Sequence, residues 1–149
     1  MNRTRPQLRN LARFLILHET KGEQHSPALD LPVYRVCEKL RSHLSAFMGI
    51  GGYRELLTYA LPRAAAEASW LSSLRVNADG SLKIPEEPQR QLNPRQILEG
   101  GVILVAELIV LLVAFIGETL TLSILREVWP EVEIPHSNLG NEEKHDPSA

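Results

Sequence analysis

The chain has 149 residues, a formal net charge of −2 and an isoelectric point near 6.2. A chain of this length can form one domain with an apolar core of its own. The charge balance argues against a general nucleic-acid-binding protein, and the single cysteine excludes an internal disulfide or a cysteine-based zinc site.

The first predicted helix covers residues 6–19. Leu8, Leu11 and Leu15 recur at helical spacing and indicate its buried face. The apolar stretch 14–17 within it is too short for the core of a signal peptide. We therefore expect a cytoplasmic protein.

The second predicted helix covers residues 31–48. Asp30 is a good N-cap, and Pro32 suits the first helical turn. Cys37 lies within the apolar stripe of this helix, so we expect an inert thiol in the core. The stripe consists of Val33, Val36, Cys37, Leu40, Leu44, Phe47 and Met48.

The middle of the chain predicts a third helix over residues 53–72 and a β-hairpin over residues 74–84. A glycine-rich stretch at 49–52 ends the second helix. Pro62 has no backbone N–H, so we expect the third helix to kink or restart there. Gly80 stands where the hairpin turn needs a positive φ.

The last predicted helix covers residues 94–129. Asn93 is its N-cap, and Pro94 occupies the first helical position. From Val102 to Ile116, Glu107 is the only residue that is not apolar. The pattern allows a bend at Gly117 before Pro130 ends the helix.

These elements predict a mostly α protein: a single helical-bundle domain over residues 1–130, with a small β-hairpin and one long, very apolar C-terminal helix. Residues 131–149 are polar, and their only large aliphatic side chains are Val132, Ile134 and Leu139. Burying three such side chains would not offset the entropy of ordering the segment, so we expect a disordered polar tail.

Segment 101–125 raises the question of whether the last helix lies in protein or in lipid. A membrane span needs roughly 20 apolar residues, whereas the uninterrupted run from Val102 to Ile116 has fifteen. Insertion of the apolar residues is worth about −6 kcal/mol, and two glutamates could return up to about +3 kcal/mol each. We favour a helix buried in a soluble protein or an oligomer, with insertion of 101–125 into the inner membrane as the alternative.

Glu107 and Glu118 are the most informative carboxylates. They are eleven residues apart, which on one helix is three turns plus about 20°, so they form a candidate polar stripe. The separation along the axis would be roughly 16 Å, too far for both to act on one atom. We expect each to be paired with a basic group, with a functional polar pocket as the second interpretation.

Gly51, Gly52 and Arg54 form a weak candidate anion site, because backbone amides at the start of a helix can hold a phosphate. The sequence does not place a strand before them or Lys-Ser/Thr after them, as a P-loop requires, so a tight turn is favoured. The five histidines lack the i,i+3 or i,i+4 spacing of a helical metal site. We therefore expect no metal, no cofactor and no catalytic residue.

Four short strings resemble an uncharacterised family of bacterial proteins. The resemblance implies a bacterial source, and it transfers neither an activity nor a site. The strings are Arg35-Val36-Cys37-Glu38-Lys39-Leu40-Arg41, Gly51-Gly52-Tyr53-Arg54, Phe115-Ile116-Gly117-Glu118 and Val128-Trp129-Pro130.

The sequence is most consistent with a non-catalytic helical interaction or regulatory protein, which acts by self-association or by docking a partner protein. A membrane-associated protein is the first alternative. An enzyme whose site is assembled from distant residues is the second. We expect no nucleic-acid partner, because the chain has only eight aromatic residues that could stack on bases, and none stands in a cluster of basic residues.

Overall fold

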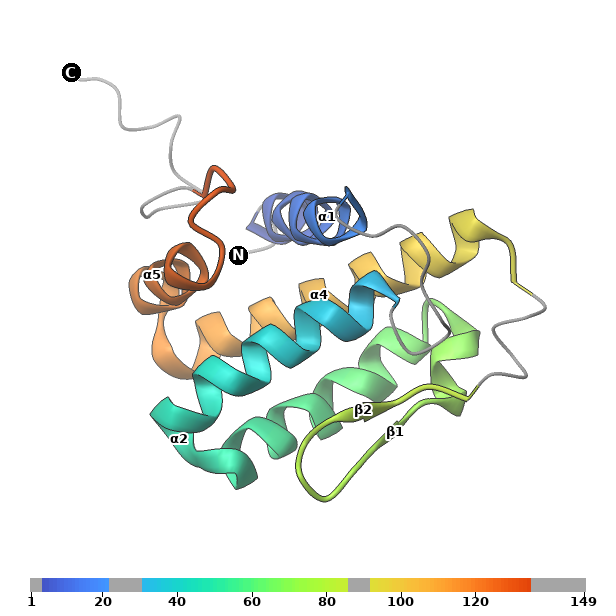
Figure 1. Cartoon of the computed structure of the whole chain (residues 1–149), viewed down its shortest axis with the longest axis horizontal. Coiled ribbons are helices and arrows are strands. Elements are labelled where there is room, and N and C mark those ends of the chain that lie inside the picture. Colours follow the sequence, from blue (N-terminus) through green and yellow to red (C-terminus); the bar gives the residue numbers. More distant parts are fainter. Residues whose placement is uncertain (1–3, 22–30, 86–91, 135–149) are drawn as a thin grey trace.

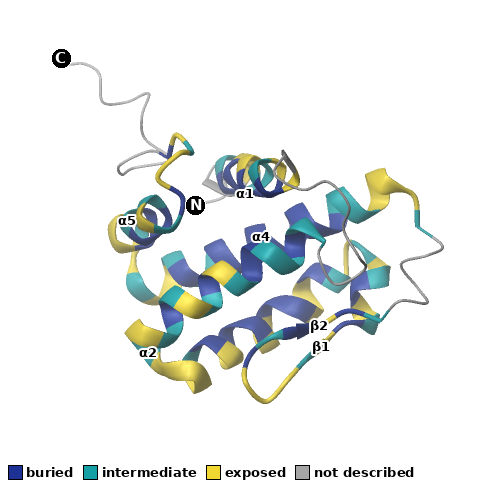
Figure 2. Ribbon diagram, in the orientation of Figure 1, coloured by how far each residue is buried: buried dark blue, intermediate teal, exposed yellow. Residues whose placement is uncertain are grey.

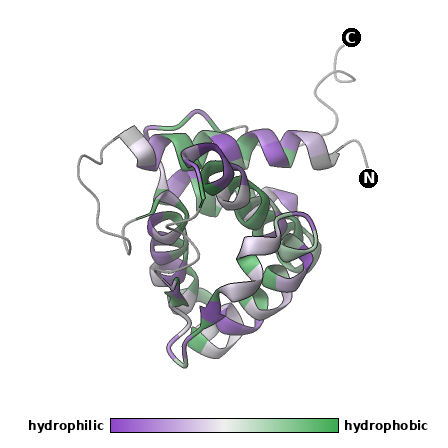
Figure 3. Cartoon of the chain, turned by 90° about the vertical axis from the view of Figure 1, so that its right-hand side faces the viewer, coloured by the Kyte–Doolittle hydropathy of each residue, from purple (hydrophilic) through white to green (hydrophobic). Residues whose placement is uncertain are grey.

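The computed structural model describes residues 4–21, 31–85 and 92–134, and it confirms a mostly helical protein with one small hairpin (Figure 1). A long central helix lies among the others. Figures 1 and 3 are a quarter turn apart, and together they show the first helix crossing the bundle instead of running along it. In chain order the elements are α1 (Thr4–Lys21), α2 (Pro32–Ala65), the 3-10 helix η2 (Ser69–Ser73), β1 (Arg75–Val76), β2 (Leu82–Lys83), α4 (Pro94–Ile116) and α5 (Glu118–Val128).

Helix α2 doubles back on itself at a single residue. Gly49 has φ 84° and ψ 156°, and it is the one non-helical position inside α2. It divides the helix into a first arm, residues 32–48, and a second arm, residues 50–65, which lie side by side in Figure 1. The predicted end of the second helix is therefore correct, but the next helix starts earlier than residue 53, because only Gly49 adopts the positive φ that reverses the chain.

The second arm does not restart at Pro62, which was one of the two predicted outcomes there. The helix passes through Pro62 to Ala65. Because Pro62 has no N–H, the Thr58 carbonyl loses its usual donor within the helix. Both residues are exposed, so water can donate a hydrogen bond to that carbonyl instead. The predicted helix over 53–72 is also too long, since it gives way to a turn and then to η2.

Helix α4 is the centre of the core. Its N-terminus has the predicted cap: the Asn93 side chain accepts a hydrogen bond from the Gln96 backbone at 2.8 Å, and the Gln96 side chain accepts one from the Asn93 backbone at 3.0 Å. The ten consecutive residues from Gly100 to Ile109 are buried, so this stretch is surrounded on every side (Figure 2). An all-round apolar helix is thereby removed from water within the protein itself.

The predicted single helix over 94–129 is two helices. Gly117, with φ 92° and ψ 158°, ends α4 and precedes α5. Segment 101–125 is therefore not one continuous helix. Among the described residues, one helix, α4, is long and apolar enough to span a membrane, and 61% of its most apolar eighteen-residue stretch is buried in the protein. The buried core helix of a soluble protein passes the same test.

Two glycines bring α4 close to its neighbours. A Cβ added at Gly100 would lie 2.5 Å from Nε1 of Trp70 in η2, and one at Gly101 would lie 3.1 Å from Cβ of Val33 in α2. Glycine inside a helix costs about 1 kcal/mol relative to alanine. Here the close packing that the missing side chains allow offsets that cost.

The hairpin is confirmed. Strands β1 and β2 pair antiparallel, with Val76 opposite Leu82. In the turn, the Gly80 N–H donates to the Asn77 carbonyl at 2.9 Å, and Gly80 has φ 87°. Leu82 and Ile84 are buried, so this short sheet is stabilised by packing on the helices.

The described part of the chain extends beyond the predicted domain boundary at residue 130. Trp129 is fully buried, and Ile134 is only 7% exposed. Residues 131–134 of the predicted tail are described, and Ile134 adds an apolar contact to the core. The rest of the predicted tail, residues 135–149, lies outside the described residues.

Candidate functional site

A buried carboxylate joins α1, the first arm of α2 and the residue that follows α5. Glu19 is only 4% exposed. Its Oε2 accepts hydrogen bonds from Lys39 Nζ at 2.6 Å and from Trp129 Nε1 at 2.8 Å. Its Oε1 lies 3.5 Å from Nε of Arg35, and Lys39 Nζ lies 6.0 Å from the centroid of the Trp129 ring. Three segments that are distant in sequence thus meet on one side chain.

The ionised form of Glu19 is favoured despite its burial. Burial alone would raise the pKa of this carboxyl group, but the hydrogen bonds from Lys39 and Trp129 and the charges of Lys39 and Arg35 outweigh it. The pKa of Glu19 is therefore below its usual value. The sequence analysis missed this group, although Glu19 lies eleven residues after Leu8 and thus on the same apolar stripe of α1.

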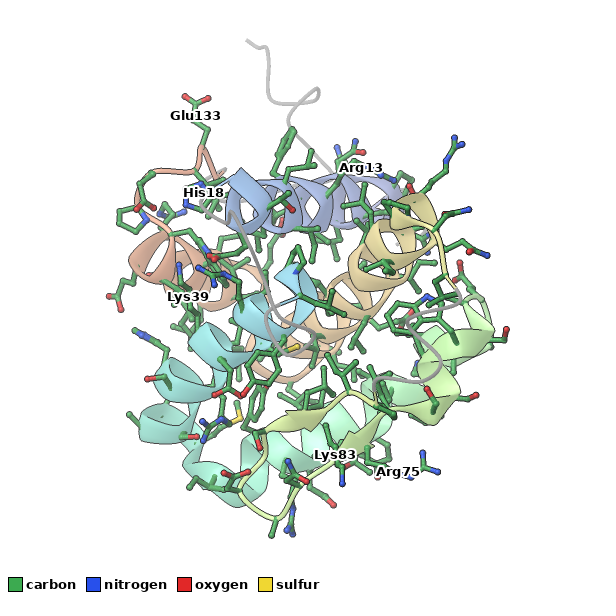
Figure 4. All side chains as sticks on the ribbon, turned by 45° about the vertical axis from the view of Figure 1, so that its right-hand side comes forward. Arg13, His18, Lys39, Arg75, Lys83 and Glu133 are labelled. Atoms are coloured by element: carbon green, nitrogen blue, oxygen red, sulfur yellow. The ribbon has the colours of Figure 1, made fainter. Side chains whose placement is uncertain are left out.

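Two histidine–glutamate pairs lie beside this cluster. His18 Nε2 is 3.7 Å from Glu131, and His43 Nε2 is 3.1 Å from Glu127. His18 and Lys39 both lie on the α5 side of the molecule (Figure 4). Next to them, an open groove of about 680 Å³ separates the first arm of α2 from the end of α5. The groove is lined by Glu38, Lys39, Ser42, His43, Ala46, Phe47 and Val128.

The candidate stripe of Glu107 and Glu118 is not assembled. Glu107 is 5% exposed in α4, and Nε of Arg63 in α2 lies 3.4 Å from its Oε1, so the expected burial beside a basic partner is found. Glu118 instead lies in the first turn of α5, where a carboxylate is favoured by the helix dipole. Gly117 turns the chain between them, so spacing along one helix does not apply.

Replacing Glu107 by glutamine should lower the free energy of unfolding by about 1–2 kcal/mol, through loss of a charge-assisted hydrogen bond. Glu107→Leu should cost less, because the Arg63 side chain is 58% exposed and can turn to solvent. Urea denaturation of both variants, with exposed Glu133→Gln as control, measures the difference. If the leucine variant were less stable than the glutamine variant, the Arg63 side chain would not be able to turn towards solvent.

The weak anion-site candidate is also not assembled. Gly51 and Gly52 are helical residues of the second arm, just after the turn at Gly49. Arg54 donates from Nη1 to the Ala78 carbonyl at 3.3 Å and thus supports the hairpin turn. Gly52 packs on Met48, since an added Cβ would lie 3.2 Å from that side chain.

Cys37 is buried in the core, as predicted. Burial raises the pKa of its thiol to about 12, so the reactive thiolate is scarce at neutral pH. Tyr53 donates a hydrogen bond to the Cys37 carbonyl at 3.2 Å. Within the described ranges, His, Cys, Asp and Glu side chains do not gather in a group of three that could hold a metal ion.

The C-terminal half of α4 carries an apolar surface that the sequence analysis did not identify. The unbroken run of buried residues ends at Ile109; Leu112 is still buried, whereas Phe115 is 62% exposed. On the neighbouring second arm of α2, Tyr59 is 57% exposed. We name this surface the apolar face; it comprises Tyr59, Val110, Leu111, Ala114 and Phe115.

The limits of the apolar face follow from the packing of α1. Pro6 and Arg9 of α1 line a small cleft together with Ala106 and Val110 of α4. Arg9 also forms an ion pair with Glu67 at 3.2 Å, just beyond the end of α2. Helix α1 thus covers α4 on this side as far as Val110, and the apolar face begins where that cover ends.

Comparison with family models, with curated proteins and with solved structures found no match for this chain.

Proposed function

We propose that this chain is a non-catalytic interaction protein of the cytoplasm, which acts by self-association through the apolar face. The observation that carries the proposal is the exposure, each by more than half, of Phe115 in the very apolar helix α4 and of Tyr59 in the neighbouring second arm. Large contiguous apolar surfaces on soluble domains commonly mark binding sites for other proteins.

The apolar face fits a protein surface better than a polar ligand. Its two aromatic side chains supply the large, rigid contacts that dominate protein interfaces. Arg9 and Arg63 lie at its α1 end and Glu55 near its other end, so charged groups stand at the rim and apolar groups in the middle. This distribution is typical of protein–protein interfaces.

Light scattering coupled to gel filtration, without detergent and at tens of micromolar protein, tests the proposal. We expect a particle of at least twice the 16.7 kDa mass of one chain. Phe115→Ser should shift it towards a monomer, whereas Phe14→Ser, at a residue 55% exposed on α1, should not. A wild-type monomer at these concentrations would overturn self-association.

A second candidate, membrane association, rests on the length and hydropathy of α4. Inserting α4 would require α1, α2 and α5 to leave the stretch from Gly100 to Ile109, which they bury in the described fold. Fractionation of the expressing cells separates the two candidates. Recovery of the chain only with membranes would favour this second function over the first.

A further inference from the structure

The second arm of α2 and helix α4 run antiparallel in a fixed register. Arg63 of the second arm pairs with Glu107 of α4, and beyond the end of that arm Trp70 of η2 packs on Gly100, closer to the start of α4. Figure 1 shows the same opposite directions. In antiparallel helices, four residues back along the second arm correspond to four residues forward along α4. Starting from the Arg63–Glu107 pair, one such step places Tyr59 beside Leu111, and a second step places Glu55 beside Phe115.

Along the second arm, the exposed residues Glu55, Tyr59 and Arg63 form a row with opposite charges at its two ends. They are spaced four residues apart, so they share one stripe, and each charge lies about 6 Å along the axis from Tyr59. The Arg63 side chain remains 58% exposed despite its contact with Glu107, which leaves room for a second carboxylate beside the guanidinium.

We infer that the partner at the apolar face is a second copy of this chain, related by a two-fold axis that passes near Tyr59. This inference rests on the proposed self-association and specifies its geometry. With the two second arms antiparallel, Glu55 of one copy faces Arg63 of the other, and the same contact occurs twice. A two-fold interface needs a surface that complements itself, and a row with a negative and a positive end has this property only in the antiparallel orientation.

The apolar residues of α4 follow the same symmetry. Leu111 lies beside Tyr59 at the axis, while Phe115 lies at the Glu55 end of the face. The axis therefore brings Phe115 of one copy over the aliphatic part of Arg63 and over Val110 of the other. Two exposed aromatic side chains per copy, Tyr59 and Phe115, would be removed from water.

Disulfide trapping of Tyr59→Cys tests the position of the axis. A residue near a two-fold axis approaches its own copy, so mild oxidation should link this variant into a dimer. The native Cys37 is buried and does not compete. Phe14→Cys is the matched control, because Phe14 is 55% exposed against 57% for Tyr59 but lies on α1. Equal linking of both variants would overturn the inference.

Charge reversal tests the orientation. Glu55→Arg replaces two attractive contacts by two repulsive ones and should weaken dimerisation by about tenfold at low salt. Glu133→Arg makes the same charge change at an exposed residue near the end of the described chain and should leave the dimer unchanged. Circular dichroism melts establish that each variant is folded.

The outcomes separate the two proposals. A monomeric wild-type chain refutes self-association itself. A dimeric wild-type chain with no linking at Tyr59→Cys, and with equal dimerisation of Glu55→Arg and Glu133→Arg, refutes only the two-fold arrangement. In that case the copies meet elsewhere.

Discussion

Trp129→Ala should lower the free energy of unfolding by about 3–5 kcal/mol, the usual cost of truncating a large aromatic side chain in a core. Trp129 is fully buried, and its indole N–H is bonded to Glu19. Removing it leaves a cavity and a buried carboxylate with one donor fewer. Thermal denaturation should show a fall of roughly 10 °C or more.

Pro130→Ala is the control for this variant, because Pro130 is exposed and is adjacent to Trp129. It should change stability by no more than about 0.5 kcal/mol. If Trp129→Ala melted at the same temperature as Pro130→Ala, Trp129 would not be packed against α1 and α2 as described.

The contribution of ionised Glu19 to the free energy of unfolding can be measured from the dependence of stability on pH. Because the folded-state pKa of Glu19 lies below its usual value of 4.5, the stabilisation from its ionised form is fully present above that pH. It is lost as the pH falls through the lowered pKa of the folded state. Wild type should therefore exceed Glu19→Gln in stability near neutral pH, and the difference should shrink in strong acid.

Gly100→Leu should destabilise the fold by about 3 kcal/mol, at the upper end of the usual range for overpacking a core. Even a Cβ at this position would lie 2.5 to 2.7 Å from three atoms of the Trp70 indole, which also donates a hydrogen bond to the Gln96 carbonyl. The indole is a rigid ring, so either it or α4 must move. Urea denaturation measures the loss.

Two further variants attribute this loss to the contact with Trp70. Gly51→Ala changes a helical glycine that has nothing within 4 Å of an added Cβ, so it should stabilise the helix by up to about 1 kcal/mol. In a Trp70→Ala background, Gly100→Ala should likewise cost nothing. A continued loss in that background would assign the effect to some other neighbour of α4.

The sequence predicts those elements whose signals are local. The cap at Asn93, the turn at Gly80 and the buried stripe around Cys37 each depend on a few nearby residues, and each is found. The stripe is shorter than predicted, because Phe47 at its end is 52% exposed. The paired carboxylates failed for a specific reason. The eleven-residue spacing of Glu107 and Glu118 has meaning only on one helix, and Gly117 changes the chain direction between them.

The hydrogen-bonded cluster around Glu19 could not be predicted from the sequence for a different reason. Its partners Lys39 and Trp129 are 20 and 110 residues away, so only the tertiary packing of α1 brings them together. A carboxylate on the apolar stripe of α1 was the available signal, but it does not indicate which groups will pair with it. The apolar face was missed likewise, because the sequence of α4 does not reveal how far α1 covers it.

The enclosure of α4 also constrains the order in which the protein can form during its synthesis. Helices α1 and α2 bury most of their apolar side chains against a helix that follows them in the chain. At typical translation rates, α1 waits on the order of 5–20 s between the synthesis of Lys21 and that of Ile116. During that interval the helix that buries most of its apolar side chains is missing, so the core closes only when α4 has emerged.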